Sequence, residues 1–182
     1  MHWHNEPPVW QVDGANLTVT TAAGSDYWRK THYGFIRANG HFYASEVAGD
    51  FVADVAVRGA YHTLYDQAGL MLWVDEENWL KCGIEYVDGV QYASAVVTRD
   101  YSDWAVSPLA ESPATVYFRV TRSGTAVEIH YSLDGGTFEL LRVTYLPMQA
   151  TVQIGPMCAS PGESGFDVGF EGFQVESMTS KE

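Results

Sequence analysis

Short segments in which apolar and polar residues alternate recur along most of the chain and are separated by turn residues. A period of two is typical of β-strands that bury one face. Asp88-Gly89 lies directly between two such segments and indicates a two-residue hairpin, and Asn39-Gly40 indicates another tight turn. No segment has a sustained helical period. Strands are expected at 16–21, 26–29, 34–38, 41–45, 50–58, 67–74, 79–87, 90–99, 115–122, 126–133, 137–144, 150–155 and 166–175.

Strands that follow one another about every ten residues, with almost no helix, predict an all-β fold, either an antiparallel sandwich or a barrel. The chain has 182 residues, enough to bury a sizeable core, and contains no long linker or low-complexity tract. We therefore expect a single domain over residues 1–182, with a frayed tail at about 177–182.

The hairpin formed by 67–74 and 79–87 combines core residues with charged ones. Pairing Val74 with Trp79 across a four-residue loop sets Ala68 opposite Glu85 and predicts that Lys81 and Glu85 share one face. The opposite face is expected to be the core. It consists of Gln67, Gly69, Met71, Trp73, Leu80, Cys82, Ile84 and Tyr86.

The same register places an aliphatic patch beside Lys81 and Glu85. Leu70, Leu72 and Val74 would form this patch, and an exposed patch of this kind needs a cover. The segment 99–105, "RDYSDWA", is expected to be a loop at the sheet edge that supplies the cover through its aromatic side chains.

The chain is strongly acidic, with 23 Asp and Glu against 10 Lys and Arg and a net charge of −13. Nucleic-acid-binding proteins show a basic footprint instead, and anionic membrane surfaces repel an acidic protein. We therefore expect no nucleic acid and no membrane among the partners. The start "MHWHNEPPVW" lacks the basic and apolar regions of a signal peptide, which predicts a cytoplasmic protein. Nothing in the sequence indicates an oligomeric state.

Cofactor and metal chemistry has little support in the sequence. Cys82 and Cys158 lie in apolar, strand-like segments and are expected to be buried, reduced thiols. The six histidines are scattered, and neither a paired-cysteine nor a HExxH pattern occurs. We expect no metal site and no cofactor. A structural calcium ion bound by the acidic loop 75–78 remains an alternative. No Gly-x-Ser-x-Gly pattern indicates nucleophilic catalysis.

Six segments, in this order, together resemble the DUF1349 family, the regulation-of-enolase-protein-1-like group of the concanavalin A-like lectin/glucanase superfamily. They are "HWHNEPPVW" (2–10), "DYWRKTHYGF" (26–35), "NGHFY" (39–43), "YDQAGLMLWVDEENWLKCGIEYVDG" (65–89), "VVTRDYSDWA" (96–105) and "GFDVGFEGFQV" (165–175). Part of the fourth segment also resembles the C-terminal accessory β-sandwich of some family 43 glycosidases.

The resemblance implies a fold more specific than the residue pattern does. It implies a concanavalin A-like jelly-roll sandwich of two curved antiparallel sheets, in which the concave face usually carries the ligand site. It does not imply an activity, because lectins, glucanases and structural modules share this fold.

Aromatic residues make up 14% of the chain and alternate with polar groups in 26–35 and 99–105. An aromatic platform with converging hydrogen-bonding groups is typical of carbohydrate sites. A non-catalytic module that binds a carbohydrate-like ligand on its concave face is the function we expect. The expected ligand-binding residues are Trp28, His32, Tyr65, Gln67, Lys81, Glu85, Arg99, Asp103 and Trp104.

Two other functions remain open. The first is an enzyme that acts on a glycan or sugar derivative and uses Glu85, although Lys81 on the same face is expected to keep that carboxylate ionised. A retaining hydrolase needs two carboxylates about 5 Å apart. The carboxylate pairs whose spacing suits such a hydrolase are Asp50 with Asp54, Glu85 with Asp88, and Asp167 with Glu171.

The second open function is a protein-interaction or regulatory module that uses an exposed aromatic face.

Overall fold

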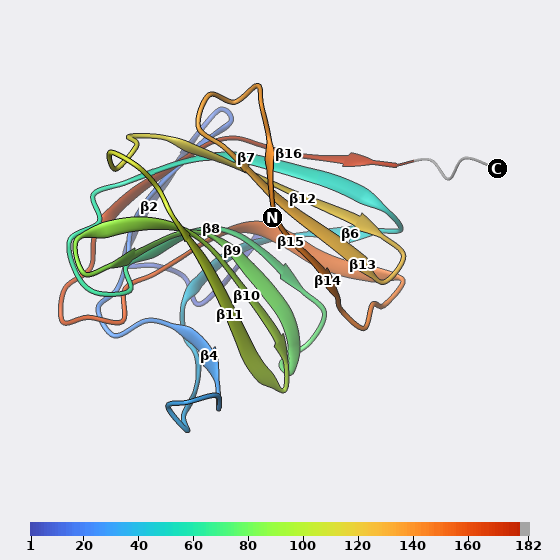
Figure 1. Ribbon diagram of the computed structural model, residues 1–182, viewed down its shortest axis with the longest axis horizontal. Coiled ribbons are helices and arrows are strands. Elements are labelled where there is room, and N and C mark those ends of the chain that lie inside the picture. Colours follow the sequence, from blue (N-terminus) through green and yellow to red (C-terminus); the bar gives the residue numbers. More distant parts are fainter. Residues whose placement is uncertain (179–182) are drawn as a thin grey trace.

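The computed structural model describes residues 1–178 and contains two seven-stranded antiparallel sheets packed face to face (Figure 1). In spatial order, sheet A contains β1 (His2–His4), β6 (His41–Ala48), β15 (Thr151–Ala159), β8 (Gln67–Trp73), β9 (Asn78–Val87), β10 (Val90–Arg99) and β11 (Tyr101–Pro108). Sheet B contains β14 (Glu139–Tyr145), β13 (Ala126–Ser132), β12 (Val116–Ser123), β7 (Phe51–Gly59), β16 (Asp167–Ser177), β3 (Asn16–Thr20) and β2 (Val9–Asp13). The predicted all-β, concanavalin A-like jelly-roll sandwich is confirmed.

A third, two-stranded sheet is formed by the hairpin of β4 (Tyr27–Arg29) and β5 (Ile36–Ala38). Figure 1 shows β4 on the side of sheet A that faces away from sheet B. The hairpin therefore covers part of the outer face of sheet A, whereas the inner face packs against sheet B in the main core.

The strands β1, β2 and β11 were not among those expected from the sequence. The segment 99–105 was predicted to be a loop, and this is wrong, because its residues continue sheet A as β11. Asp100 adopts a φ of 61° and reverses the chain so tightly that Arg99 and Tyr101 are paired. Asp is one of the few residues that tolerate this left-handed conformation. At the other end of the chain β16 extends to Ser177, and residues 179–182 of the expected tail lie outside the described residues.

The predicted register of the β8–β9 hairpin is wrong by one residue. Trp73, not Val74, pairs with Trp79, so that five residues, 74–78, lie between the paired residues, and Asp75 stabilises this turn. Oδ1 of Asp75 accepts hydrogen bonds from the backbone N–H groups of Glu77 and Asn78, both at 2.9 Å.

This slip moves the whole of β8 to the opposite face. Leu70 and Leu72 are fully buried in the main core, so their burial has nothing to do with a cover by Tyr101 and Trp104. Gln67 and Met71, which were expected in the core, instead lie opposite Glu85 and Lys81 on the outer face. The prediction that Lys81 and Glu85 share one face, with Cys82 and Ile84 in the core, is confirmed.

The outer face of sheet A has a small apolar cluster of its own beneath the hairpin. Tyr27 is 1% exposed and contacts the rings of Trp73 and Trp79 edge-on, at 6.2 and 6.0 Å between centroids. Its hydroxyl group donates a hydrogen bond of 2.7 Å to the carbonyl of Gly40. Burial of this large aromatic ring attaches the hairpin to the sheet.

Both cysteines are buried free thiols, as expected. Burial raises the pKa of Cys82 to about 12 and also raises the pKa of Cys158, so neither is a reactive thiolate. No helix in residues 1–178 has the length and apolar character required to cross a membrane.

Gly69 and Gly83 pair with each other in β8 and β9 at a point where the two backbones leave no room for a side chain. A Cβ atom added to Gly83 would lie 2.1 Å from the carbonyl oxygen of Ala68, and the backbone cannot yield easily there. We expect Gly83→Ala to lower the free energy of unfolding by about 1–3 kcal/mol. Urea denaturation measures this change.

Gly169→Ala in β16 is the matched control. A Cβ atom at that position would meet only the flexible side chain of Arg58, at 3.3 Å. Equal stability losses in the two variants would contradict the steric explanation for Gly83.

Candidate ligand pocket on the outer face of sheet A

The β4–β5 hairpin is fastened to the rest of the chain at both of its ends. At its base, Nδ2 of Asn5 donates a hydrogen bond of 2.9 Å to the carbonyl of Ala38. At the end of β4, the backbone N–H of Arg29 donates to Oγ of Ser102 at 2.9 Å, and Nζ of Lys30 contacts the Asp100 carboxylate at 2.6 Å. These contacts hold the hairpin over one half of the outer face.

A pocket of about 220 Å³ remains between the hairpin and the other half of this face. Strands β8, β9 and β11 and the hairpin contribute side chains to it, and Tyr65 and Pro161 come from neighbouring loops. The lining residues are Asp26, Trp28, Tyr33, Phe35, Arg37, Tyr65, Gln67, Lys81, Glu85, Trp104 and Pro161.

The floor of the pocket contains a buried ammonium group. Lys81 is 5% exposed, and its Nζ donates a hydrogen bond to Oε1 of Gln67 and lies 3.7 Å from Oδ1 of Asp26. The amide of Gln67 donates to the same Asp26 oxygen at 3.3 Å. A charge removed from water requires such partners, so Asp26 on the hairpin and Gln67 on β8 compensate Lys81.

Glu85 is the second buried charge of the floor and is 8% exposed. Oγ of Ser94 donates a hydrogen bond of 2.7 Å to its Oε2 atom. The indole N–H of Trp104 donates to the same Ser94 oxygen at 3.1 Å, which directs the Ser94 hydroxyl hydrogen toward the carboxylate. Among the described residues, no group donates a hydrogen bond of normal geometry to Oε1, which leaves that atom available to a ligand.

Burial raises the pKa of Glu85, and the opposing effects of Lys81, Ser94 and Trp104 are smaller. Lys81 lowers the pKa of Glu85, as expected, but its effect is not large enough to prevent a net rise. Loss of water around Glu85 outweighs the attraction of an ammonium group that is already shared with Asp26 and Gln67.

Aromatic rings form the walls of the pocket. The hydroxyl groups of Tyr33 and Tyr65 meet at 3.1 Å and join the hairpin to the loop before β8. This hydrogen bond, together with partial burial, raises the pKa of Tyr65 to about 12. The ring of Trp28 meets Tyr33 edge-on at 5.7 Å, and Trp104 meets Tyr65 edge-on at 6.2 Å.

Six of the nine residues expected in a ligand site line this pocket: Trp28, Tyr65, Gln67, Lys81, Glu85 and Trp104. The remaining three, His32, Arg99 and Asp103, line an open groove beside it. The sequence analysis missed Asp26, Tyr33, Phe35, Arg37 and Ser94. The dense aromatic segment 26–35 was the available signal for Tyr33 and Phe35.

The other acidic residues with suitable spacing have structural partners. The Asp54 carboxylate accepts a hydrogen bond from Arg119 at 2.7 Å, and Glu171 pairs with Arg58. Oδ1 of Asp50 accepts the backbone N–H of Gly124 at 2.7 Å. These interactions link neighbouring strands and loops of sheet B, away from the pocket.

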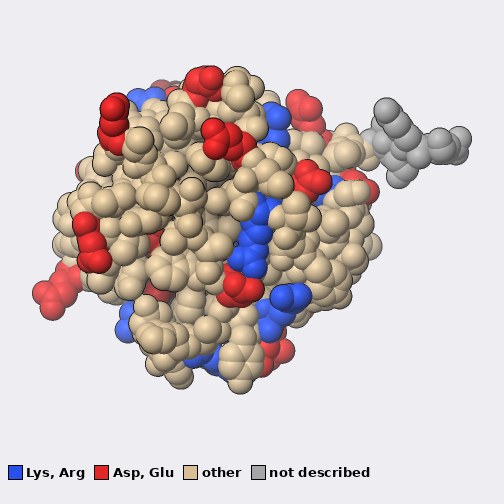
Figure 2. Space-filling view, in the orientation of Figure 1, with Lys and Arg blue, Asp and Glu red and all other residues tan. Residues whose placement is uncertain are grey.

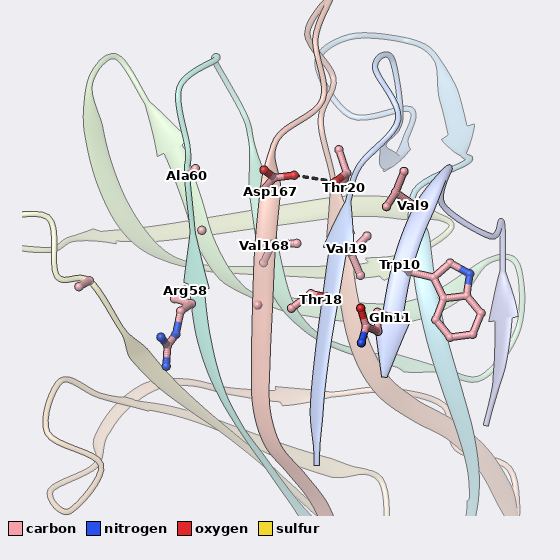
Figure 3. Close-up of a pocket in the computed structure, with 13 residues that line it drawn as sticks. Val9, Trp10, Gln11, Thr18, Val19, Thr20, Arg58, Ala60, Asp167 and Val168 are labelled. Atoms are coloured by element: carbon pink, nitrogen blue, oxygen red, sulfur yellow. Dashed lines mark hydrogen bonds between the residues drawn. The ribbon is translucent and has the colours of Figure 1, made fainter. Parts of the chain in front are cut away.

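A larger hollow, of about 710 Å³, lies on the outer face of sheet B between β2, β3, β16 and β7 (Figure 3). Its charged side chains, Asp167 and Arg58, are already paired. Asp167 accepts a hydrogen bond of 2.6 Å from Thr20, drawn as a dashed line in Figure 3, and Arg58 pairs with Glu171. The hollow contains none of the buried charged side chains of the protein, so we assign the candidate site to the smaller pocket on sheet A.

Surface charge does not indicate another site. In Figure 2 the Asp and Glu side chains are dispersed over the visible face rather than gathered in one patch. Within residues 1–178, no group of three or more His, Cys, Asp or Glu side chains is arranged to hold a metal ion.

Comparison with known proteins shows the family. Residues 3–178 match the family described as "Protein of unknown function (DUF1349)". The chain belongs to the DUF1349 family. The resemblance read from the sequence segments is thereby confirmed.

Yeast contains relatives of this DUF1349 protein. "Regulation of enolase protein 1" from Saccharomyces cerevisiae is 35% identical to it over 179 residues, which are 98% of this chain and 90% of the yeast protein. The crystal structure of a functionally unknown protein from Saccharomyces cerevisiae has a TM-score of 0.94, with 35% identity and coverage of 98% of this chain and 97% of that one.

Two bacterial structures share the fold at low identity. A GH43 protein from Bacillus licheniformis has a TM-score of 0.72 and 16% identity, covering 95% of this chain and 36% of that one. The carbohydrate binding module CBM66 from Bacillus subtilis has a TM-score of 0.62 and 11% identity, covering 96% and 95%. These two comparisons show the fold alone.

The raised pKa of Glu85 has a consequence for the stability of this DUF1349 protein. Above the ordinary glutamate value of 4.5 the unfolded chain has lost this proton while the folded protein still holds it, so stability falls as pH rises toward the folded-state pKa. We expect the stability difference between Glu85→Gln and the unchanged protein to shift in favour of the variant as pH rises above about 4.5, because only the unchanged protein loses stability there. Urea unfolding over this range measures the difference.

Glu46→Gln is the control for this measurement, because Glu46 is an exposed glutamate of β6. A stability difference for Glu85→Gln that does not change with pH, or that shifts against the variant as pH rises, would contradict the assignment.

Proposed function

We propose that this DUF1349 protein is a non-catalytic module that binds a carbohydrate ring in the pocket between the β4–β5 hairpin and sheet A. The observation that carries the proposal is an aromatic wall set against a buried polar floor. Sugar rings combine apolar C–H faces, which pack on aromatic rings, with hydroxyl groups that form hydrogen bonds. The walls are Trp28, Tyr33, Phe35, Tyr65 and Trp104, and the polar floor is Asp26, Gln67, Lys81 and Glu85.

The unpaired oxygen of Glu85 supports a ligand that donates hydrogen bonds. Oε2 is held by Ser94, whereas Oε1 receives no hydrogen bond of normal geometry from residues 1–178. Oε1 is not one of the fully buried unpaired side-chain atoms of the described residues, so it is accessible from the pocket, and a sugar hydroxyl is a suitable donor for it. Lys81 and Gln67 provide donors and acceptors beside it.

The size of the pocket favours one sugar ring. Its volume of about 220 Å³ is smaller than the range of about 300–1,000 Å³ found for drug-sized ligands. The fold likeness to a carbohydrate binding module and to a GH43 protein agrees with this class of ligand. We place this function in the cytoplasm, where the free thiols Cys82 and Cys158 remain reduced.

A second candidate function is an enzyme that acts on a glycan or sugar derivative. The observation in its favour is the raised pKa of Glu85, because an upward shift favours the protonated form that a general acid needs. A third candidate, a protein-interaction module, would use the rim of the same pocket without a small ligand.

Trp104 provides the test of sugar binding. Calorimetry with the methyl glycosides of xylose, arabinose, glucose, galactose, mannose and fructose should identify at least one ligand. Trp104→Ala should then weaken its binding by about ten- to a hundred-fold, as expected for a central aromatic contact. Thermal unfolding should change little, because the Trp104 side chain lies outside the two buried clusters.

Trp10→Ala is the matched control, since Trp10 is 37% exposed, Trp104 is 36% exposed, and Trp10 lies on the far edge strand β2. Equal loss of binding in the two variants would count against the pocket. If none of the six glycosides binds, the carbohydrate proposal is wrong and the interaction-module candidate takes its place.

Glu85→Gln separates the first two candidates. In an enzyme that uses Glu85 as the proton donor, the variant should lose turnover of a nitrophenyl glycoside of the bound sugar and still bind it, because the shape is retained. In a binding module, the unchanged protein shows no turnover at all, and the variant only binds the sugar more weakly.

A further inference from the structure

We infer that the ligand is the end of a longer neutral glycan, with its terminal ring in the pocket and the following unit in the groove beside it. The inference rests on the proposed function and adds to it the position of the ring within its chain. It arises from the way in which the pocket and the groove share side chains.

The groove is an open hollow of about 700 Å³ that adjoins the pocket. Trp28, Tyr33 and Trp104 line both hollows, so a ligand that contacts these three rings in the pocket lies next to the groove. The remaining lining residues of the groove are Thr31, His32, Arg99, Tyr101, Ser102 and Asp103.

The pocket has a polar floor and a wall that runs from the hairpin to a neighbouring loop. The hydroxyl bond between Tyr33 and Tyr65 joins the hairpin to the loop before β8. The linked side chains of Lys81, Gln67 and Asp26 form its floor. The floor prevents a glycan chain from passing downward through the pocket, and the volume of about 220 Å³ leaves room for one ring, which favours a terminal ring.

The charges of the groove already have partners within the protein, which favours a neutral ligand. Asp103 pairs with Arg142 at 2.9 Å, and the guanidinium group of Arg99 lies 5.8 Å from the ring centroid of Tyr145. A uronic acid or a phosphorylated sugar would have to compete with these contacts, or would approach the carboxyl group of Glu85 in the pocket.

Tyr101 offers the groove a surface for the second sugar unit. Its side chain is among the most exposed of the large hydrophobic residues, at 60%. The ammonium group of Lys30 lies 5.0 Å from its ring centroid and holds the ring in place. Tyr101 does not line the pocket, so its contribution to binding can be measured separately.

Calorimetry with sugars of increasing length tests the inference. The probes are the methyl glycoside that binds best and the linear di-, tri- and hexasaccharides that end in the same sugar. From the methyl glycoside to the disaccharide, we expect the dissociation constant to fall about ten-fold. Further units should change it little, and the stoichiometry should remain one protein per chain at every length.

Tyr101→Ala should remove most of the gain from the second unit and leave binding of the methyl glycoside unchanged. Val9→Ala is the control, because Val9 is 62% exposed on β2 and touches neither the pocket nor the groove. It should change neither affinity.

Three results would overturn the inference. Equal affinities for the methyl glycoside and the disaccharide would leave the proposed function intact and show that the groove takes no part. More than one protein bound per hexasaccharide would show recognition of internal rings. If no methyl glycoside or oligosaccharide binds, the proposed function fails, and this inference fails with it.

Discussion

The buried ammonium group of Lys81 needs a compensating charge. This requirement links the β4–β5 hairpin, which covers part of sheet A, to the candidate site. Lys81 points outward from β9 yet is only 5% exposed, because the β4–β5 hairpin lies over it. Loss of one partner from a buried ion pair costs about 3–5 kcal/mol, so the hairpin must bring a carboxylate with it. Asp26 at the start of the hairpin supplies that carboxylate, and Gln67 on β8 completes the arrangement. The segment that closes the second apolar cluster through Tyr27 thus also builds the floor of the pocket.

The alternation of side chains along β9 allows one strand to serve two environments. Cys82 and Ile84 pack in the main core, while Lys81 and Glu85 point to the pocket. Gly83 lies between the two charged residues, where close approach of β8 excludes any side chain. The charged residues are therefore separated by bare backbone, and each has its own partner.

Much of the architecture could be predicted from the sequence, because strand periodicity and the Asp88-Gly89 turn are local signals. The register of the β8–β9 hairpin could not, because it depends on how the Asp75 carboxylate binds backbone N–H groups within the loop. One extra loop residue reversed the faces of β8 and placed Gln67 wrongly in the core. The partnership of Asp26 with Lys81 was equally inaccessible, since it joins segments far apart in the chain. The local mixture of aromatic and charged side chains nevertheless indicated six of the residues that line the pocket.

Glu85 determines how binding and catalysis differ at this site. While Ser94 donates to Oε2, the proton of an un-ionised Glu85 lies on Oε1, the atom left to a ligand. Oε1 is then a hydrogen-bond donor below the pKa of Glu85 and an acceptor above it. Burial moves that pKa upward, toward the range in which cells work. A sugar hydroxyl can meet either form, since it both donates and accepts, whereas a leaving oxygen requires the protonated one. Oε1 can therefore bind a sugar hydroxyl in either protonation state. It can act as the general acid of an enzyme only while it carries the proton. Substitution of Glu85 separates the two functions for this reason.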